Sequence, residues 1–281
     1  MGTHLQKGRL KSATVNGIVV ILVFLILFPF LWILISSFKP SVELFGKDAF
    51  RFYPQHPTFE NYVQVFRDHP FGRYLLNSLI VATATTLWSI AVATFAAYAI
   101  AHMRFKGKAL ILGMILAISM FPQIVTISPI YIFLTKVGLT NSYIGLIIPY
   151  TTFALPMAVW LLVAFFRKIP PELFEAAKID GSTTMQTYWY VLLPLATPGI
   201  FTTAILIFIA AWNEFLFALV INTNEAFKTV PVGISMFQGR YTTPWALISA
   251  VTVIVTLPLA AMVLLFQKQI VSGLTAGSMK G

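Results

Sequence analysis

The amino-acid sequence predicts an all-α, polytopic membrane protein with about six transmembrane helices. Of its 281 residues, 58% are hydrophobic and only 10% are charged, and the mean hydropathy is +0.84. A soluble core of this length cannot bury so much apolar surface, so lipid must cover much of it. Uncharged runs of about 20 residues, the length that crosses a bilayer core of about 30 Å, also recur along the chain.

Six such runs are expected to span the membrane, and only the fifth contains a charged residue, Glu214. The segment before the first run is polar and basic, and the run lacks a small-residue cleavage site, so we expect a retained first span and not a signal peptide. Residues 1–281 then form a single transmembrane domain. The predicted spans are 15–38, 74–101, 109–135, 142–166, 198–221 and 245–266.

The distribution of Lys and Arg predicts the orientation, because short cytoplasmic loops retain positive charge. With the N-terminus inside, eleven of the 19 Lys and Arg residues fall in inner segments and eight in outer ones. Five of those eight lie in one long outer loop, residues 39–73, so the bias among the short loops is stronger than the totals indicate. We therefore expect both termini in the cytoplasm.

The outer loop 39–73 is rich in aromatic residues and contains Pro40, Pro54, Pro57 and Pro70. This composition predicts a compact cap and not a flexible linker. A surface for an external partner and a folded connector both fit it.

Prolines recur inside two predicted spans, at Pro122 and Pro129 in the third and at Pro149 and Pro156 in the fourth. Seven residues are nearly two helical turns, so the members of each pair share a face. Each proline also frees a backbone carbonyl that needs a partner. Such faces belong against protein or a water-filled path, and kinks that serve only packing explain them equally well.

The inner loop 167–195 is too long and too patterned for a simple turn, and we interpret it as two short helices. Pro170 and Pro171 suit a first helical turn, and Gly181 can take the left-handed conformation that stops a helix. Thr183 with Gln186 fits a capping box that opens a second helix. This second helix is expected to end before the prolines at positions 194 and 198.

On the first of these helices, Leu173, Ala176 and Ala177 share a face, and the two alanines leave it small enough to enter a groove. A short helix that projects from the membrane in this way can dock onto a partner. A helix that rests on lipid headgroups would show the same pattern.

Residues 175–182, Glu-Ala-Ala-Lys-Ile-Asp-Gly-Ser, followed by Pro194 and Pro198-Gly199, resemble the EAA loop of ABC importer permeases, in which E-A-A is followed by three residues and a glycine. Trp212-Asn213-Glu214-Phe215 and the ending at 273–281 resemble the carbohydrate-uptake branch. Within that branch the likeness is greatest to the shorter, six-span permease of maltose-type systems. The resemblance implies the type I ABC importer permease fold.

The resemblance also implies a function, that of an importer permease subunit which forms, with a second permease, the translocation pathway for a sugar or oligosaccharide. Further implied partners are two ATPase subunits, which would hold ATP and Mg, and an extracytoplasmic solute-binding protein. The expected location is the cytoplasmic membrane of a prokaryote, and this chain would bind no cofactor itself. Glycerol-phosphate-type cargo also fits, since nearby branches share the loop.

In this family the helix around E-A-A sits in a cleft of the ATPase, which implies a docking site here. Glu175 and Asp180 would make polar or charge-assisted contacts, the alanines would permit a close fit and Gly181 would set the bend. The expected docking residues are Leu173, Glu175, Ala176, Ala177, Asp180 and Gly181.

The glycine-rich C-terminus would by itself indicate a frayed end. In maltose-type relatives, however, such a tail reaches the ATPase interface. The resemblance therefore implies contact with the ATPase for Leu274, Thr275, Ala276, Gly277 and Lys280.

Glu214 lies well inside the fifth span, where an isolated carboxylate would cost several kcal/mol unless it is paired, protonated or hydrated. It should therefore face protein or water. Asn213 and Glu214 could line the translocation pathway, or they could contact a neighbouring helix or the partner permease. In maltose-type systems the sugar is held mainly by the other permease, which favours the second interpretation.

No phosphate-binding loop of the form G-x-x-x-x-G-K-[ST] is present in the sequence, so ATP hydrolysis is expected on partner subunits and the chain is not expected to be an enzyme. The four histidines lack metal-ligand spacing, and cysteine is absent. The net charge of +10 is scattered between apolar runs, which argues against nucleic-acid binding.

Two other functions are considered. An ion-coupled secondary transporter could use Glu214 and the proline-broken helices, but it leaves the E-A-A loop unexplained. A membrane anchor for a peripheral complex accounts for that loop but not for the proline-marked spans.

Overall fold

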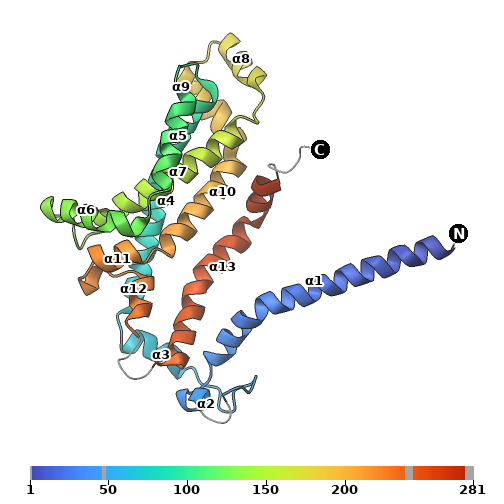
Figure 1. The fold of residues 1–281 in the computed structure, drawn as a ribbon, viewed down its shortest axis with the longest axis vertical. Helices are drawn as coiled ribbons and strands as arrows, with labels where there is room; N and C mark the ends of the chain where they lie inside the picture. Colours follow the sequence, from blue (N-terminus) through green and yellow to red (C-terminus); the bar gives the residue numbers. More distant parts are fainter. Residues whose placement is uncertain (1, 46–48, 238–242, 276–281) are drawn as a thin grey trace. The chain divides into compact units, whose positions relative to one another are not determined.

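The computed structural model describes residues 2–45, 49–237 and 243–275, and within these ranges the regular structure is entirely helical (Figure 1). The chain divides into two compact units. The first comprises Met1–Pro70 and Met236–Thr256, and the second comprises Phe71–Ser235 and Leu257–Gly281. The last helix, α13 (Trp245–Thr275), contributes residues to both units.

In the first unit, α1 (Gly2–Ser36) contains the most hydrophobic candidate span, Thr14–Ser36, with a mean hydropathy of 3.3. None of its apolar window is buried within the chain. A helix with so much exposed apolar surface must be covered by lipid or by another subunit.

The loop 39–73 of this unit folds around one buried lysine. The Lys39 ammonium is fully buried, donates a hydrogen bond to the carbonyl oxygen of Arg51, and lies 4.9 Å from the ring centroid of Trp32. Glu43, in the short helix α2 (Ser41–Phe45), accepts a hydrogen bond from the backbone N–H of His56 at 2.9 Å. These contacts confirm the compact loop predicted from its prolines and aromatic residues.

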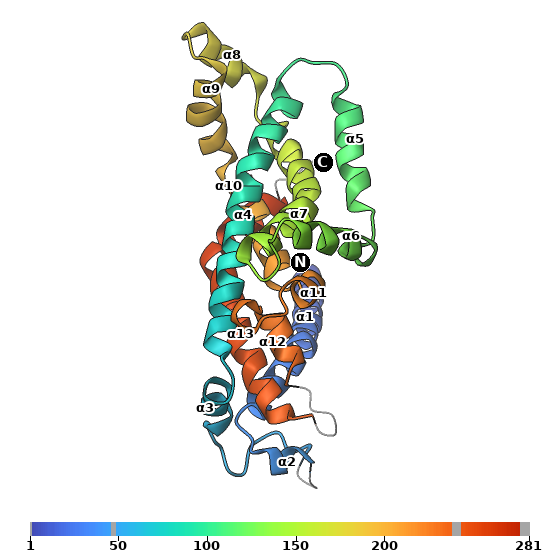
Figure 2. The same cartoon turned by 90° about the vertical axis from the view of Figure 1, so that its left-hand side faces the viewer.

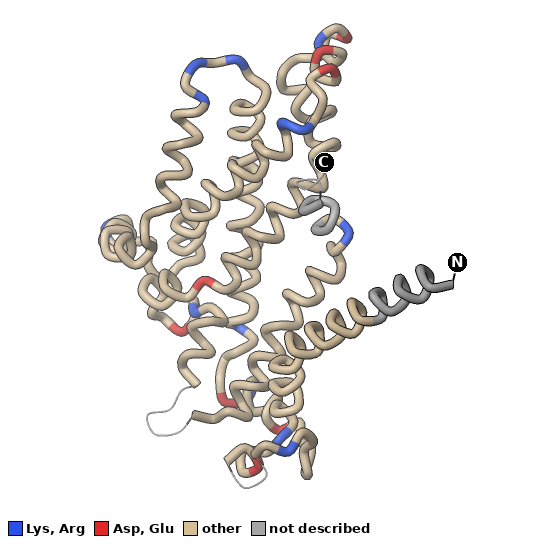
Figure 3. The backbone as a smooth tube through the Cα atoms, turned by 45° about the vertical axis from the view of Figure 1, so that its right-hand side comes forward, with Lys and Arg blue, Asp and Glu red and all other residues tan. Residues whose placement is uncertain are grey.

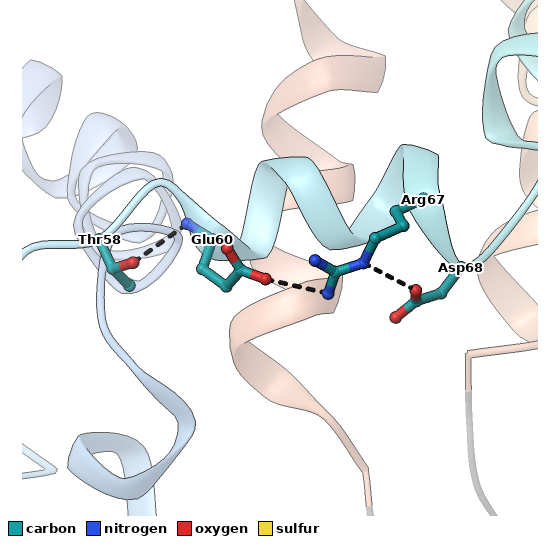
Figure 4. Close-up of polar contacts among 4 residues, drawn as sticks. All are labelled: Thr58, Glu60, Arg67 and Asp68. Atoms are coloured by element: carbon teal, nitrogen blue, oxygen red, sulfur yellow. Dashed lines mark hydrogen bonds and ion pairs between the residues drawn. The ribbon is translucent and has the colours of Figure 1, made fainter.

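The exposed face of helix α3 (Glu60–Arg67) carries a small polar cluster (Figure 4). Arg67 contacts Glu60 at 2.9 Å and Asp68 at 3.2 Å, and Thr58 Oγ1 accepts the backbone N–H of Glu60 at 3.0 Å. The hydrogen bond from Arg67 lowers the pKa of Asp68 below its ordinary value. Because Arg67, Glu60 and Asp68 are exposed to water, their ion pairs contribute little to stability.

The second unit is built on three long helices that run side by side, α4 (Phe71–His102), α7 (Tyr143–Phe166) and α10 (Leu193–Trp212) (Figures 1 and 2). Their shared core contains large side chains that are fully buried, including Leu162, Phe166, Leu192 and Ile207. The later part of α13 packs on α10, where Phe201 and Phe266 stack with their ring centroids 5.5 Å apart.

The predicted third span, 109–135, is not one straight helix. The chain forms α5 (Lys108–Ser119) and α6 (Gln123–Lys136), bent by 91° at the break between them. Pro122 lies at the turn, where its backbone is extended (φ −62°, ψ 127°). Because proline has no N–H, it cannot continue the backbone hydrogen bonds of α5. Helix α7, by contrast, runs unbroken through Pro149 and Pro156.

The chain stays helical through Pro194, where the sequence predicts the end of a helix. After α8 (Pro171–Ile179), the chain continues through α9 (Thr184–Thr187) and a π-helical segment, Tyr188–Leu192, directly into α10. In the π segment the backbone hydrogen bonds span five residues instead of four, as in the bond from the N–H of Leu193 to the carbonyl of Tyr188. Pro194 therefore falls in the first turn of α10, where its missing N–H is tolerated.

The fifth predicted span, 198–221, is interrupted near its middle. Helix α10 ends at Trp212 and α11 (Leu216–Ile221) follows after three residues. A 3₁₀ turn at Glu225–Phe227 and α12 (Val230–Ser235) complete this unit before α13.

Candidate functional site

Helix α8 is attached to the second unit by one narrow face. Phe174 and Ala177, three residues apart, are each only 8% exposed, and Phe174 belongs to the core shared with α4 and α7. The Phe174 ring lies 4.1 Å from the His102 ring, centroid to centroid, at the end of α4. His102 Nε2 in turn lies 3.0 Å from the carbonyl oxygen of Phe166, the last residue of α7. The short helix is thus connected directly to the ends of two spans.

The opposite face of α8 is exposed. Leu173 is 42% exposed and Ile179 is 87% exposed, and Glu175, Ala176 and Asp180 are exposed beside them. Large apolar side chains on a short projecting helix indicate a surface that another molecule covers.

The structure therefore divides the docking residues predicted on α8 between a buried face and an exposed face. Ala177 faces its own chain, whereas Leu173, Glu175, Ala176 and Asp180 face outward. Phe174 and Ile179 were not singled out from the sequence. The apolar spacing of Phe174 and Ala177 was the available signal for the buried face.

Gly181 ends α8 as predicted. Its φ is +81°, the left-handed conformation, and no atom lies within 4 Å of the position that a Cβ would occupy. Ser182 donates its N–H to the carbonyl of Ala177 at 2.9 Å, and Gly181 donates to Lys178 at 3.0 Å. These two bonds form a Schellman motif, which satisfies carbonyls that the helix end leaves free.

The capping box predicted for the following helix is confirmed. The hydroxyl of Thr183 accepts the backbone N–H of Gln186 at 3.3 Å, and the side-chain oxygen of Gln186 accepts the N–H of Thr183 at 2.8 Å. The turn between α8 and α9 is therefore fixed by a glycine on one side and a reciprocal cap on the other.

Lys and Arg positions occur at the same end of the second unit, on α8 and on the connection between α4 and α5 (Figure 3). A groove of about 690 Å³ is lined there by Arg104, Lys108 and Lys178, together with Glu175 and the His102 ring. The long helices of this unit carry few charges between their ends. This end of the unit therefore presents positive charge and exposed carboxylates to water.

The break between α10 and α11 is organised by Glu214. Its carboxylate oxygens accept the backbone N–H groups of Phe217 at 2.9 Å and Ala218 at 3.2 Å. These N–H groups belong to the first turn of α11 and have no partner within that helix. Asn213, the other residue singled out here, is exposed and donates its side-chain amide to the carbonyl of Ile209 at 2.8 Å. Glu214 thus holds the next segment of its own chain.

The predicted C-terminal contact residues are only partly within the described region. Leu274 and Thr275 end α13, and nothing is described of their side chains. Ala276, Gly277 and Lys280 lie outside the described residues.

Comparison with known proteins identifies the family. Residues 89–275 match the family described as "Binding-protein-dependent transport system inner membrane component". The matched range contains α8, its Schellman turn and the Glu214 break.

Curated relatives extend the match to almost the whole chain. The sulfoquinovosyl glycerol transport system permease protein SmoH of Agrobacterium fabrum is 44% identical, over 91% of this chain and 89% of its own length. The trehalose/maltose transport system permease protein MalG of Thermococcus litoralis is 43% identical, over 93% and 94%. The trehalose transport system permease protein SugB of Mycobacterium tuberculosis is 43% identical, over 91% and 93%.

A solved structure supports the fold. A chain of a bacterial ABC transporter involved in the import of the acidic polysaccharide alginate superposes with a TM-score of 0.79, covering 93% of this chain and 97% of that one. Their sequences are 21% identical, so this likeness concerns the fold alone.

Proposed function

The chain belongs to the family of binding-protein-dependent transport system inner membrane components, and we propose that it is a permease subunit of an ATP-binding-cassette importer that carries a sugar or oligosaccharide. The cargo follows from the relatives, whose names specify trehalose, maltose or a sulfoquinovosyl glycerol. Each of these solutes contains a sugar ring. A second permease would complete the pathway.

The observation that carries the proposal is the two-faced helix α8. Its outer face, with Leu173 and Ile179 exposed alongside the carboxylates of Glu175 and Asp180, suits a cleft on a separate ATPase subunit. Its inner face holds Phe174 against His102. A displacement of α8 by the ATPase would therefore be transmitted to α4 and α7. ATP and Mg are assigned to the ATPase subunits and not to this chain.

The distribution of charge supports an inner location for this end of the molecule. The α4–α5 connection and α8 lie at the same end of the second unit (Figures 1 and 2). Lys and Arg residues occur on both, including Arg104, Lys106 and Lys178. By the positive-inside rule, this charge supports a cytoplasmic position for this end, and we propose that both termini are cytoplasmic. The outer loop faces the extracytoplasmic binding protein.

Glu214 gives little support to an ion-coupled secondary transporter. Its carboxylate is already bonded to two backbone N–H groups, which accounts for a charge at this depth. The exposed face of α8 would also have no role in such a transporter.

The test uses Ile179→Asp in the chain co-expressed with the second permease and the ATPase. Placing a charge in an apolar cleft should reduce recovery of the ATPase with the membrane subunits at least tenfold, and abolish solute-stimulated ATP hydrolysis. Ile179→Leu keeps the apolar contact and serves as the matched control. Full ATPase recovery with both Ile179→Asp and Leu173→Asp would overturn the assignment of this face.

A further inference from the structure

A cavity of about 170 Å³ lies beside the Glu214 break, between α4, α7 and the α10–α11 junction. Its polar lining comes from Thr85, Gln123, Tyr150 and Glu214, and part of its apolar wall comes from Phe153 and Phe217. One water molecule needs only about 10–15 Å³ on this scale, so the cavity has room for a larger occupant. All of these residues belong to the second unit.

Two hydroxyls at this cavity are buried and poorly satisfied within the chain. Thr85 is fully buried, and its hydroxyl has no hydrogen-bond partner among the described residues. The adjacent Thr86 behaves in the usual way and donates its hydroxyl to the carbonyl of Ala82 at 2.7 Å. Tyr150 is 5% exposed, and its hydroxyl lies near the Glu214 carboxylate without a hydrogen bond of normal geometry. Buried polar groups of this kind call for a ligand or water.

Two other polar side chains at the cavity, Glu214 and Gln123, have the chemistry to bond a ligand. Glu214 is fixed by its bonds to the first turn of α11. A carboxylate offers about four acceptor positions, so these two bonds leave capacity for a hydroxyl donor. Gln123 lines the same cavity with an amide that can both donate and accept.

The apolar wall restricts the kind of ligand. The rings of Phe153 and Phe217 lie 5.4 Å apart, centroid to centroid, and provide a surface for the C–H face of a ring. Among the residues that the structure describes, neither Lys nor Arg lines the cavity, and Glu214 would repel a phosphate, sulfonate or carboxylate. A neutral ring that carries hydroxyls matches both the polar and the apolar lining.

We propose that this cavity is a subsite for one neutral sugar ring of the transported solute, and that this chain forms the subsite without residues from the second permease. The proposal rests on the function proposed above. It adds that the ring hydroxyls bond to Thr85, Tyr150 and Glu214. It also predicts that any anionic part of a solute is bound elsewhere.

The experiment measures uptake of radiolabelled trehalose and maltose by the complete transporter in proteoliposomes, with its binding protein and ATP. Tyr150→Phe and Thr85→Val remove one hydroxyl each with almost no change in shape. Each should raise the KM or lower the maximal rate of uptake about threefold to tenfold, and the double variant should do so more strongly.

Thr86→Val is the matched control, because its buried hydroxyl is bonded within α4 and does not line the cavity. It should leave uptake unchanged. Thermal unfolding of the Tyr150→Phe and Thr85→Val transporters should be near that of the wild type, since neither hydroxyl makes a normal hydrogen bond in the chain.

The outcomes separate this proposal from the one on which it rests. If the wild type imports either sugar but both hydroxyl variants import it equally well, the cavity holds only water and the subsite is wrong, while the importer assignment stands. If the wild type imports neither sugar and ATP hydrolysis does not respond to them, the sugar cargo itself is wrong. Reduced uptake by Thr86→Val equal to that of Thr85→Val would also overturn the subsite, because it would indicate a general packing effect.

Discussion

The chain interrupts its helices in two different ways, at Gly181 after α8 and at Glu214 between α10 and α11. At Gly181 the backbone turns in the left-handed conformation, and chain N–H groups satisfy the free carbonyls. At Glu214 a carboxylate satisfies the free N–H groups of the next helix. The first break is exposed, and the second precedes buried residues, Phe217 and Ala218.

The difference follows from access to water. In an exposed turn, water can replace a missing hydrogen bond, so a glycine that permits the geometry is sufficient. In a buried, apolar segment an unpaired N–H costs several kcal/mol, so the break needs an acceptor of its own. The Glu214 carboxylate therefore supplies the hydrogen-bond acceptor that water supplies at an exposed turn. The comparison predicts that substitutions at Glu214 cost more than substitutions at Gly181.

The largest effect is expected from Glu214→Ala. The N–H groups of Phe217 and Ala218 would lose their acceptor in a buried site, which should destabilise the protein by about 2–3 kcal/mol. The measurement is thermal unfolding of the purified membrane complex in detergent. Glu214→Gln retains one acceptor oxygen, and its loss of stability should be smaller. An Ala variant as stable as the wild type would show that the break needs no cap.

The sequence was sufficient to predict those features that depend only on residues adjacent along the chain. The stop at Gly181 and the box formed by Thr183 and Gln186 are local, and both were predicted at the correct positions. The need of Glu214 for a partner was also evident. The identity of that partner could not be predicted, because a carboxylate in a span can reach another helix, a ligand or its own backbone. Only the path of the chain decides among them.

The sequence was not sufficient where packing decides. Pro122 and Pro149 occur in equally apolar runs, yet the chain turns sharply at one and continues through the other. Pro149 is buried against neighbouring helices, whereas Pro122 and its neighbours are exposed. The packing around α7 can hold a kinked helix together, and the α5–α6 segment lacks that support. Burial of Ala177 and exposure of Ala176 on α8 likewise depend on where α4 and α7 end.

An intermediate effect is expected from Gly181→Ala. Nothing lies within 4 Å of the new Cβ, so the cost is the left-handed backbone alone, about 1–2 kcal/mol, confined to the turn after α8. Thermal unfolding of the membrane complex should change little. Solute-stimulated ATP hydrolysis should fall, because α8 would no longer be held in one orientation.

Gly181→Asn is the matched control for this substitution, since asparagine tolerates the left-handed conformation better than alanine. It should retain more of the stimulated hydrolysis. If Ala and Asn reduce hydrolysis equally, the side chain itself obstructs the ATPase, and backbone geometry is not the cause. If Gly181→Ala destabilises the complex as much as Glu214→Ala does, the proposed difference between an exposed and a buried break is wrong.

The smallest effect is expected from Thr183→Ala, which removes one half of the exposed capping box. The N–H of Gln186 would lose an acceptor at 3.3 Å, but water can take its place, so the cost should be about 0.5–1 kcal/mol. The measurement is hydrogen exchange of the backbone amides of residues 184–187, which should become faster while exchange in α10 stays slow. Thr183→Ser keeps the hydroxyl and should restore the protection. If exchange also accelerates beyond the π segment, α9 and α10 unfold together, and the cap then stabilises the whole continuous helix and not only its first turn.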